Sequence, residues 1–75
     1  LAARDDVQGL TRGSRGQAVK NLQNRLIELE YLDDTPDGIF GKKTEDAVMA
    51  AQEFYHLEPT GKADNSLQKL LYAEN

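Results

Sequence analysis

The chain has 75 residues, of which 39% are hydrophobic and 29% charged, and its net charge is −4. These values predict one small folded domain, and the negative charge argues against nucleic acid, whose phosphates are bound by Lys and Arg. The absence of cysteine excludes disulfides and thiolate metal sites, and no apolar run is long enough to span a membrane. With no signal-peptide pattern and a first residue other than methionine, we expect a module from a longer polypeptide.

The first predicted helix covers residues 15–30. It opens the predicted folded domain, residues 12–75, which follows a tail or linker at residues 1–11. Ser14 and Gln17 have the spacing of a capping box, which predicts a helix start near Arg15. Apolar residues then recur at steps of three and four, as on a buried helix face. That face consists of Val19, Leu22, Leu26 and Leu29, with Ile27 beside it.

A loop and a second helix are predicted next. Residues 33–38 combine acidic residues with Pro36 and Gly38, a composition typical of turns. The helix starts near Gly41, and acidic residues in its first turns complement the positive end of the helix dipole. Its predicted apolar face consists of Ala47, Val48, Ala51, Phe54 and Tyr55.

A third, shorter helix ends the chain. Residues 58–61 form another turn, and Asp64 is a good N-cap for a helix that places Leu67, Leu70 and Leu71 on one side. The two turn-to-helix segments match each other, and so do the two longer helices. The sequence therefore predicts an all-α fold of three helices with an internal helix-turn-helix duplication.

Three segments of the chain together resemble a known family. They are Gly-Ser-Arg-Gly-x-x-Val-x-x-Leu-Gln-x-x-Leu at residues 13–26, Asp-Gly-Ile-Phe-Gly-x-x-Thr-x-x-Ala-Val at residues 37–48, and Gln52 with Thr60, Gly61 and Asp64. This ordered set is similar to the type 1 peptidoglycan-binding domain, which occurs beside amidases, lysozyme-like hydrolases and L,D-transpeptidases. The resemblance covers residues 10–72, almost the whole predicted folded part.

The resemblance implies a three-helix orthogonal bundle with no catalytic activity and no cofactor. It also implies a secreted bacterial module, in the cell wall, outside the cell or in the periplasm. As a monomer, the module would bind the glycan and stem peptide of peptidoglycan and anchor a covalently attached cell-wall enzyme, without nucleic acid or membrane partners. The chain departs from the family at Glu30 and His56, where Gly often ends the long helices. A left-handed conformation there would add modest strain.

The candidate ligand-binding residues lie mainly in the loop before the second helix. This segment offers backbone donors, a carboxylate and an aromatic ring at a helix start. A structural role is open for each: the Asp can close an Asx turn, the Phe can fill the core and the Thr can cap the helix. A tyrosine beside the loop offers a flat face for a sugar. The candidates are Tyr31, Asp37, Gly38, Phe40, Gly41 and Thr44.

Other residues are better explained by structural roles. Gln23 and Gln52 occupy equivalent places in the two long helices, and we expect them to brace the turns through hydrogen bonds. The run from Asp33 to Gly38 imitates the start of a calcium loop, but Thr44 stands where a bidentate Glu would be needed, so no metal is expected. The alternative function is a protein-protein docking or regulatory module on the same scaffold.

Overall fold

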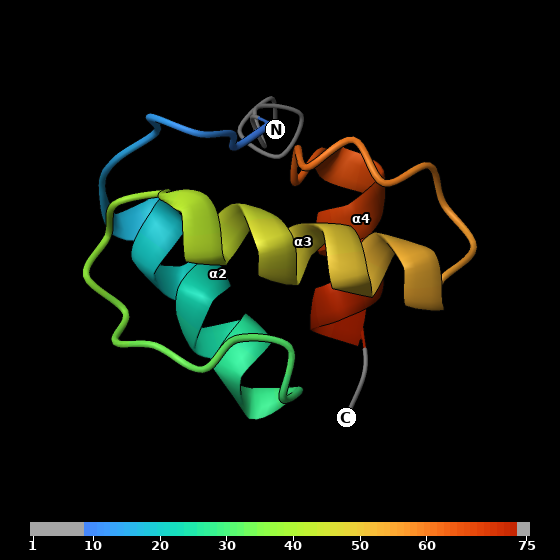
Figure 1. The fold of residues 1–75 in the computed structure, drawn as a ribbon, viewed down its shortest axis with the longest axis horizontal. Helices are drawn as coiled ribbons and strands as arrows, with labels where there is room; N and C mark the ends of the chain where they lie inside the picture. The colour runs from blue at the N-terminus through green and yellow to red at the C-terminus, as the bar shows by residue number, and fades with distance from the viewer. Residues whose placement is uncertain (1–8, 74–75) are drawn as a thin grey trace, which may run out of the picture.

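The computed structural model describes residues 9–73, which contain three helices (Figure 1). These are α2 (Gln17–Glu28), α3 (Lys42–Phe54) and α4 (Asn65–Ala73). α2 packs against both of the other helices, and α3 runs across α2 and α4 in the view shown. Over the described range there are no strands, only two isolated antiparallel bridges, so the prediction of an all-α three-helix fold is confirmed. None of these helices is long and apolar enough to cross a membrane.

The predicted apolar faces are buried or partly buried, with two exceptions, and residues outside these faces complete the core. Its buried side chains are Leu10, Val19, Leu22, Leu26, Leu32, Phe40, Ala47, Val48, Ala51, Ala63, Leu67 and Leu71. The predictions for Phe54 and Leu70 are wrong, because these side chains are 62% and 37% exposed. In α3 the buried face continues at the helical period from Ala51 to Tyr55, which is partly buried, and Phe54 therefore points to one side of it.

The predicted capping box at the start of α2 is also wrong. Gly16 is the N-cap, with a φ of 121° that suits glycine, and no side chain caps the helix. Ser14 is engaged elsewhere: its carbonyl accepts from the Phe40 N–H at 2.9 Å and its hydroxyl from the Thr11 N–H at 3.1 Å. Arg15 takes part in one of the bridges. Pairing with the distant loop holds this segment extended, and the helix begins later.

The two long helices end in the same way, at the residues where the sequence departs from the family pattern. Glu30 has a φ of 69° and His56 a φ of 63°, both in the left-handed region. In each case the next N–H reaches a carbonyl five residues back, at 2.8 and 2.7 Å, which closes the helix end. The expected strain of a residue with a Cβ in this conformation is therefore present at both ends.

Leu10 packs with the domain, although the sequence places it in the tail. Its side chain is buried, and its backbone exchanges two hydrogen bonds with Ala63, at 3.1 and 2.8 Å. These bonds fix the chain entry beside the start of α4. Residues 1–8 of the predicted tail lie outside the described residues.

Candidate functional site

The loop between α2 and α3 is organised around Gln23, whose side chain is only 2% exposed. Its Oε1 accepts from the Gly38 N–H at 2.8 Å. Its Nε2 donates to Asp37 Oδ1 at 3.2 Å, to the Ile39 carbonyl at 2.9 Å and to Thr44 Oγ1 at 2.9 Å. One amide from α2 therefore holds both the turn and the first turn of α3, which confirms the predicted bracing role.

The turn between α3 and α4 repeats this arrangement around Gln52, which is also 2% exposed. Its Oε1 accepts from the Gly61 N–H at 3.0 Å, and its Nε2 donates to Thr60 Oγ1 at 3.1 Å and to the Lys62 carbonyl at 3.0 Å. The shared hydrogen-bond pattern confirms the predicted duplication and the bracing role of Gln52. In both copies a buried amide satisfies the backbone of a tight turn that would otherwise be left unpaired.

Asp37 closes an Asx turn, one of the two roles left open for it. Its Oδ1 accepts from the Ile39 N–H at 2.9 Å as well as from Gln23 Nε2. The Ile39 N–H and then the Gln23 amide hold the pKa of Asp37 below its ordinary value of 3.8, because both bonds favour the charged form. The side chain is exposed, and Oδ2 takes no part in these bonds. One oxygen of Asp37 therefore holds the turn, while the charge of its carboxylate stays exposed at the surface.

Five of the six candidate residues lie within the segment 37–44, where Gln23 bonds to three of them, and three of the five are buried. Phe40 is a core residue, as favoured by the sequence, and Thr44 accepts from Gln23 and does not cap α3. Gly38 is buried, with a φ of 79°, and Gly41 is the N-cap of α3. Contact of these residues with a ligand stays a prediction.

Tyr31, the sixth candidate, lies in a different place. It lines a hollow of about 350 Å³ between the start of the loop and α3. The lining residues are Tyr31, Leu32, Asp33, Lys43, Asp46 and Ala47. The Tyr31 ring also meets the exposed Phe54 ring edge to face, with centroids 6.2 Å apart. We refer to this feature as the Tyr31 hollow.

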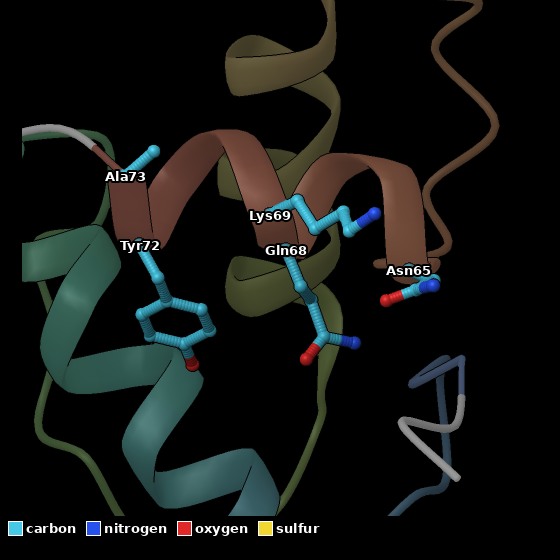
Figure 2. Close-up of a pocket in the computed structure, with 5 residues that line it drawn as sticks. All are labelled: Asn65, Gln68, Lys69, Tyr72 and Ala73. Carbon is cyan, nitrogen blue, oxygen red and sulfur yellow. The ribbon is translucent and has the colours of Figure 1, made fainter. Parts of the chain in front are cut away.

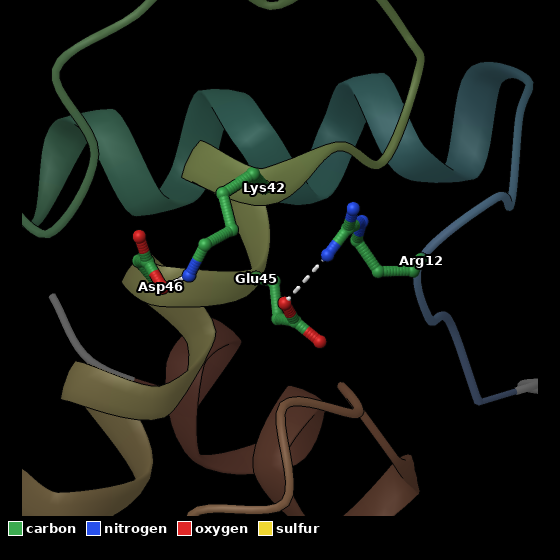
Figure 3. Close-up of polar contacts among 4 residues, drawn as sticks. All are labelled: Arg12, Lys42, Glu45 and Asp46. Atoms are coloured by element: carbon green, nitrogen blue, oxygen red, sulfur yellow. Dashed lines mark hydrogen bonds and ion pairs between the residues drawn. The ribbon is translucent and has the colours of Figure 1, made fainter.

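Of the three charged residues that line the Tyr31 hollow, only Asp46 has an ion pair within the described residues. Lys42 Nζ reaches Asp46 Oδ1 at 2.9 Å, one turn further along α3 (Figure 3). Lys43 and Asp33 make no ion pair with any other residue in the range 9–73. Sequence reasoning missed both, since a lysine on a helix and an aspartate in a loop are the ordinary pattern of a solvated surface.

A second hollow, of about 410 Å³, lies on α4 and is lined by none of the candidate residues (Figure 2). It is lined by Asn65, Gln68, Lys69, Tyr72 and Ala73. Gln68 Nε2 donates to the Ala63 carbonyl at 2.6 Å, and burial raises the pKa of Tyr72. This α4 hollow is the larger of the two, but its lining contains one lysine and no carboxylate. It therefore offers a ligand one positive charge and no negative charge to pair with.

Comparison with known proteins gives one family match. The model of the family described as "Putative peptidoglycan binding domain" matches residues 15–71. No curated protein matches the chain. Among solved structures, the N-terminal domain of SleB is similar with a TM-score of 0.86 and 31% identity, and the match covers 89% of this chain and 92% of that one.

Two larger proteins contain a similar part. Burkholderia AP3 phage endolysin matches at 36% identity with a TM-score of 0.83, over 88% of this chain and 25% of the endolysin. The L,D-transpeptidase from Xylanimonas cellulosilytica matches at 38% identity with a TM-score of 0.83, over 88% of this chain and 32% of that structure. The chain thus spans about a quarter to a third of these two solved chains.

Proposed function

The chain belongs to the peptidoglycan binding domain family, and we propose that it is a non-catalytic module that holds an attached cell-wall enzyme at peptidoglycan. The observation that carries this proposal is the likeness of 88% of the chain to part of an endolysin and part of an L,D-transpeptidase. In both proteins most of the length lies outside the similar part, which leaves room for a catalytic domain.

The proposed module is bacterial and secreted, and it works in the cell wall, outside the cell or in the periplasm. Its partners are the glycan and stem peptide of peptidoglycan and the covalently attached enzyme domain, and it acts as a monomer. Weak binding is enough for this role, because a tether raises the effective concentration of the enzyme at the wall.

We place the ligand contacts at the Tyr31 hollow and at the outward oxygen of Asp37. The volume of the hollow, about 350 Å³, is in the range of small-ligand sites. A tyrosine side chain provides a large amphipathic surface with few rotatable bonds, which suits contact with a sugar or a peptide. Gly38, Phe40, Gly41 and Thr44 shape the loop that carries Asp37.

Co-sedimentation of the purified domain with insoluble peptidoglycan tests the proposal, with cellulose and chitin as controls. We expect selective pelleting that weakens in Tyr31→Ala and in Asp37→Asn. Asn keeps an oxygen for the Asx turn, so the second variant removes charge with little change in structure. Asp34→Asn is the matched control, because it removes the same charge from the same loop outside the proposed contacts.

Helix content measured by circular dichroism shows whether each variant is folded. If the wild-type domain stays in the supernatant at high concentration, binding to the wall is refuted. Tight binding to a neighbouring enzyme domain would then favour the docking module. Turnover of labelled peptidoglycan by the isolated chain would contradict the non-catalytic role.

A further inference from the structure

The Tyr31 hollow carries two charges that the fold itself does not use. Asp46 is neutralised by Lys42, at 2.9 Å. Lys43 and Asp33, in contrast, are exposed and have no ion pair within the described residues. Such groups are strongly hydrated, and a ligand that pairs with both would compensate the loss of that hydration.

The two charges come from different walls of the hollow. Lys43 belongs to the first turn of α3, whereas Asp33 belongs to the loop that leaves α2. Tyr31, Leu32 and Ala47 supply an apolar surface between the two elements. The hollow therefore offers a donor cation, an acceptor anion and a short apolar contact, in a space of about 350 Å³.

This combination discriminates among ligand classes. A metal ion is disfavoured by the Lys43 ammonium, and the described residues contain no cluster of three or more potential metal ligands. An uncharged sugar would leave both ionised groups without a charged partner. A ligand with a carboxylate and an ammonium would satisfy both, through charge-assisted hydrogen bonds.

We infer that the Tyr31 hollow binds a short peptide that carries a free carboxylate and a free ammonium. Lys43 binds the carboxylate and Asp33 the ammonium, while Tyr31 covers the apolar part of the peptide. The inference rests on the proposed function and narrows it, since in peptidoglycan the stem peptides, and not the glycan hydroxyls, supply such a pair of charges.

Titration of the isotope-labelled domain by NMR with a defined peptide tests this inference. The probe is Nα-acetyl-L-lysyl-D-alanine, which has one ammonium and one carboxylate. Its C-terminal amide and its Nε-acetyl derivative each lack one of the charges, and tetra-N-acetylchitotetraose represents the glycan. We expect each modified peptide to bind about fivefold more weakly than the probe, the effect of losing one exposed ion pair. We expect no binding of the sugar in the hollow.

Residues of the same type outside the hollow provide matched variants. Lys43→Gln and Asp33→Asn each remove a charge from the hollow, whereas Lys20→Gln and Asp34→Asn remove the same charge from exposed residues that do not line it. Lys42 is not used, because it neutralises Asp46 in the hollow. We expect about fivefold weaker binding of the probe for the first two variants and little change for the controls. Lys43→Gln should not weaken binding of the amide any further, because the carboxylate is already gone.

The inference is overturned if the amide binds as tightly as the probe, or if Lys43→Gln and Lys20→Gln have equal effects. It is also overturned if only the sugar binds. Co-sedimentation of the same wild-type preparation with peptidoglycan keeps the two proposals apart. Pelleting without peptide binding refutes the peptide site alone, and the absence of both refutes the wall-binding function as well.

Discussion

In both turns of the duplicated unit a buried glutamine amide bonds to the turn, but the remaining hydrogen bonds differ. In the first turn Gln23 bonds to a turn closed by the carboxylate of Asp37, and also to Thr44 inside α3. In the second turn Gln52 bonds to a turn closed by the hydroxyl of Thr60, and the described hydrogen bonds include none from Gln52 into α4. The group that closes the first turn is thus charged, and the group that closes the second turn is neutral.

The helices that follow the two turns differ in how their first turns are capped. α3 begins at Lys42, and its N-cap residue, Gly41, has no side chain that could cap the helix. α4 is capped as predicted, since Asp64 Oδ1 accepts from the Leu67 N–H at 2.9 Å, and the residue before this cap pairs with Leu10. The comparison suggests that the second copy closes the fold, while the first leaves charged groups at the start of α3 available for a ligand.

The largest expected effect on stability comes from replacing the two glutamines that brace the turns. Gln23→Ala should lower the free energy of unfolding by about 3 kcal/mol and Gln52→Ala by about 2 kcal/mol, because each leaves buried backbone groups without partners. The loss of stability is larger for Gln23→Ala, because Gln23 also bonds to Thr44, which is itself buried. Urea denaturation followed by circular dichroism measures both.

A double-mutant cycle with Thr44→Val isolates that additional bond. Thr44→Val should cost less in the Gln23→Ala background than in the wild type, since its partner is absent there. Equal losses for the two glutamine variants, with no coupling to Thr44, would show that the two braces are energetically the same.

The next largest effect compares the two turn glycines. Gly38 and Gly61 have φ values of 79° and 82°, and alanine there costs about 1 kcal/mol for the left-handed conformation alone. A Cβ at Gly38 would lie 3.3 Å from the backbone oxygen of Gly16, whereas at Gly61 it would lie 3.1 Å from the side-chain Cγ of Glu45. A side chain can move more easily than backbone.

We therefore expect Gly38→Ala to cost about 2 kcal/mol and Gly61→Ala about 1 kcal/mol. Thermal denaturation of the two variants provides the measurement. Movement of Glu45 would disturb its 3.0 Å ion pair with Arg12, which is exposed and of little energetic value (Figure 3). Arg12→Ala is the control for that contribution. A larger loss for Gly61→Ala would mean that the second turn is the more rigid one.

Most of the fold could be predicted from local patterns. The periodic leucines gave the helix faces, and the equivalent positions of Gln23 and Gln52 gave their roles in the turns. The errors occurred where distant contacts decide. Ser14 has the sequence of a cap, but its carbonyl bonds to Phe40, 26 residues later, which holds the chain out of the helix. Phe54 has the composition of a core residue, but its place on α3 turns it to the surface.

The candidate site was predictable only in part for the same physical reason. The motif that contains Asp37 identified the loop, and proximity to it identified Tyr31. Lys43 and Asp33 are ten residues apart, and nothing in their sequence context indicates that they line one hollow. Only the packing of the loop against α3 brings their charges together.

A smaller effect is expected at the two helix ends. Glu30→Gly and His56→Gly should each raise the free energy of unfolding by about 0.5 kcal/mol, because relief of the left-handed strain exceeds the entropy cost of glycine. Thermal denaturation of the two variants and of their combination measures this. Since the two ends share one geometry, the effects should be equal and additive. Destabilisation by Glu30→Gly alone would reveal an interaction of its side chain that the other end lacks.

The smallest effect concerns the turn-closing groups, of which Asp37 is titratable and Thr60 is not. The pKa of Asp37 is lowered in the folded state, chiefly by the Ile39 N–H. Its contribution to stability is therefore present above the unfolded value of 3.8 and is lost as the pH falls from there through the folded pKa. Asp37→Asn should make stability less dependent on pH in this window. Thr60→Asp should make it more dependent, since the new carboxylate would accept from the Lys62 N–H in the equivalent turn.

Urea denaturation at a series of pH values between 2 and 7 measures both slopes, and Asp34→Asn controls for general charge repulsion. The result separates a property of the turn from a property of the residue. If Thr60→Asp acquires the acid dependence that Asp37→Asn loses, the shared turn geometry lowers the carboxyl pKa, and the turns differ in acid dependence only because the first carries a carboxylate. If Thr60→Asp shows no such dependence, the environment of Asp37 is special to the first copy, and the equivalence of the two turns is limited to the hydrogen bonds that they share.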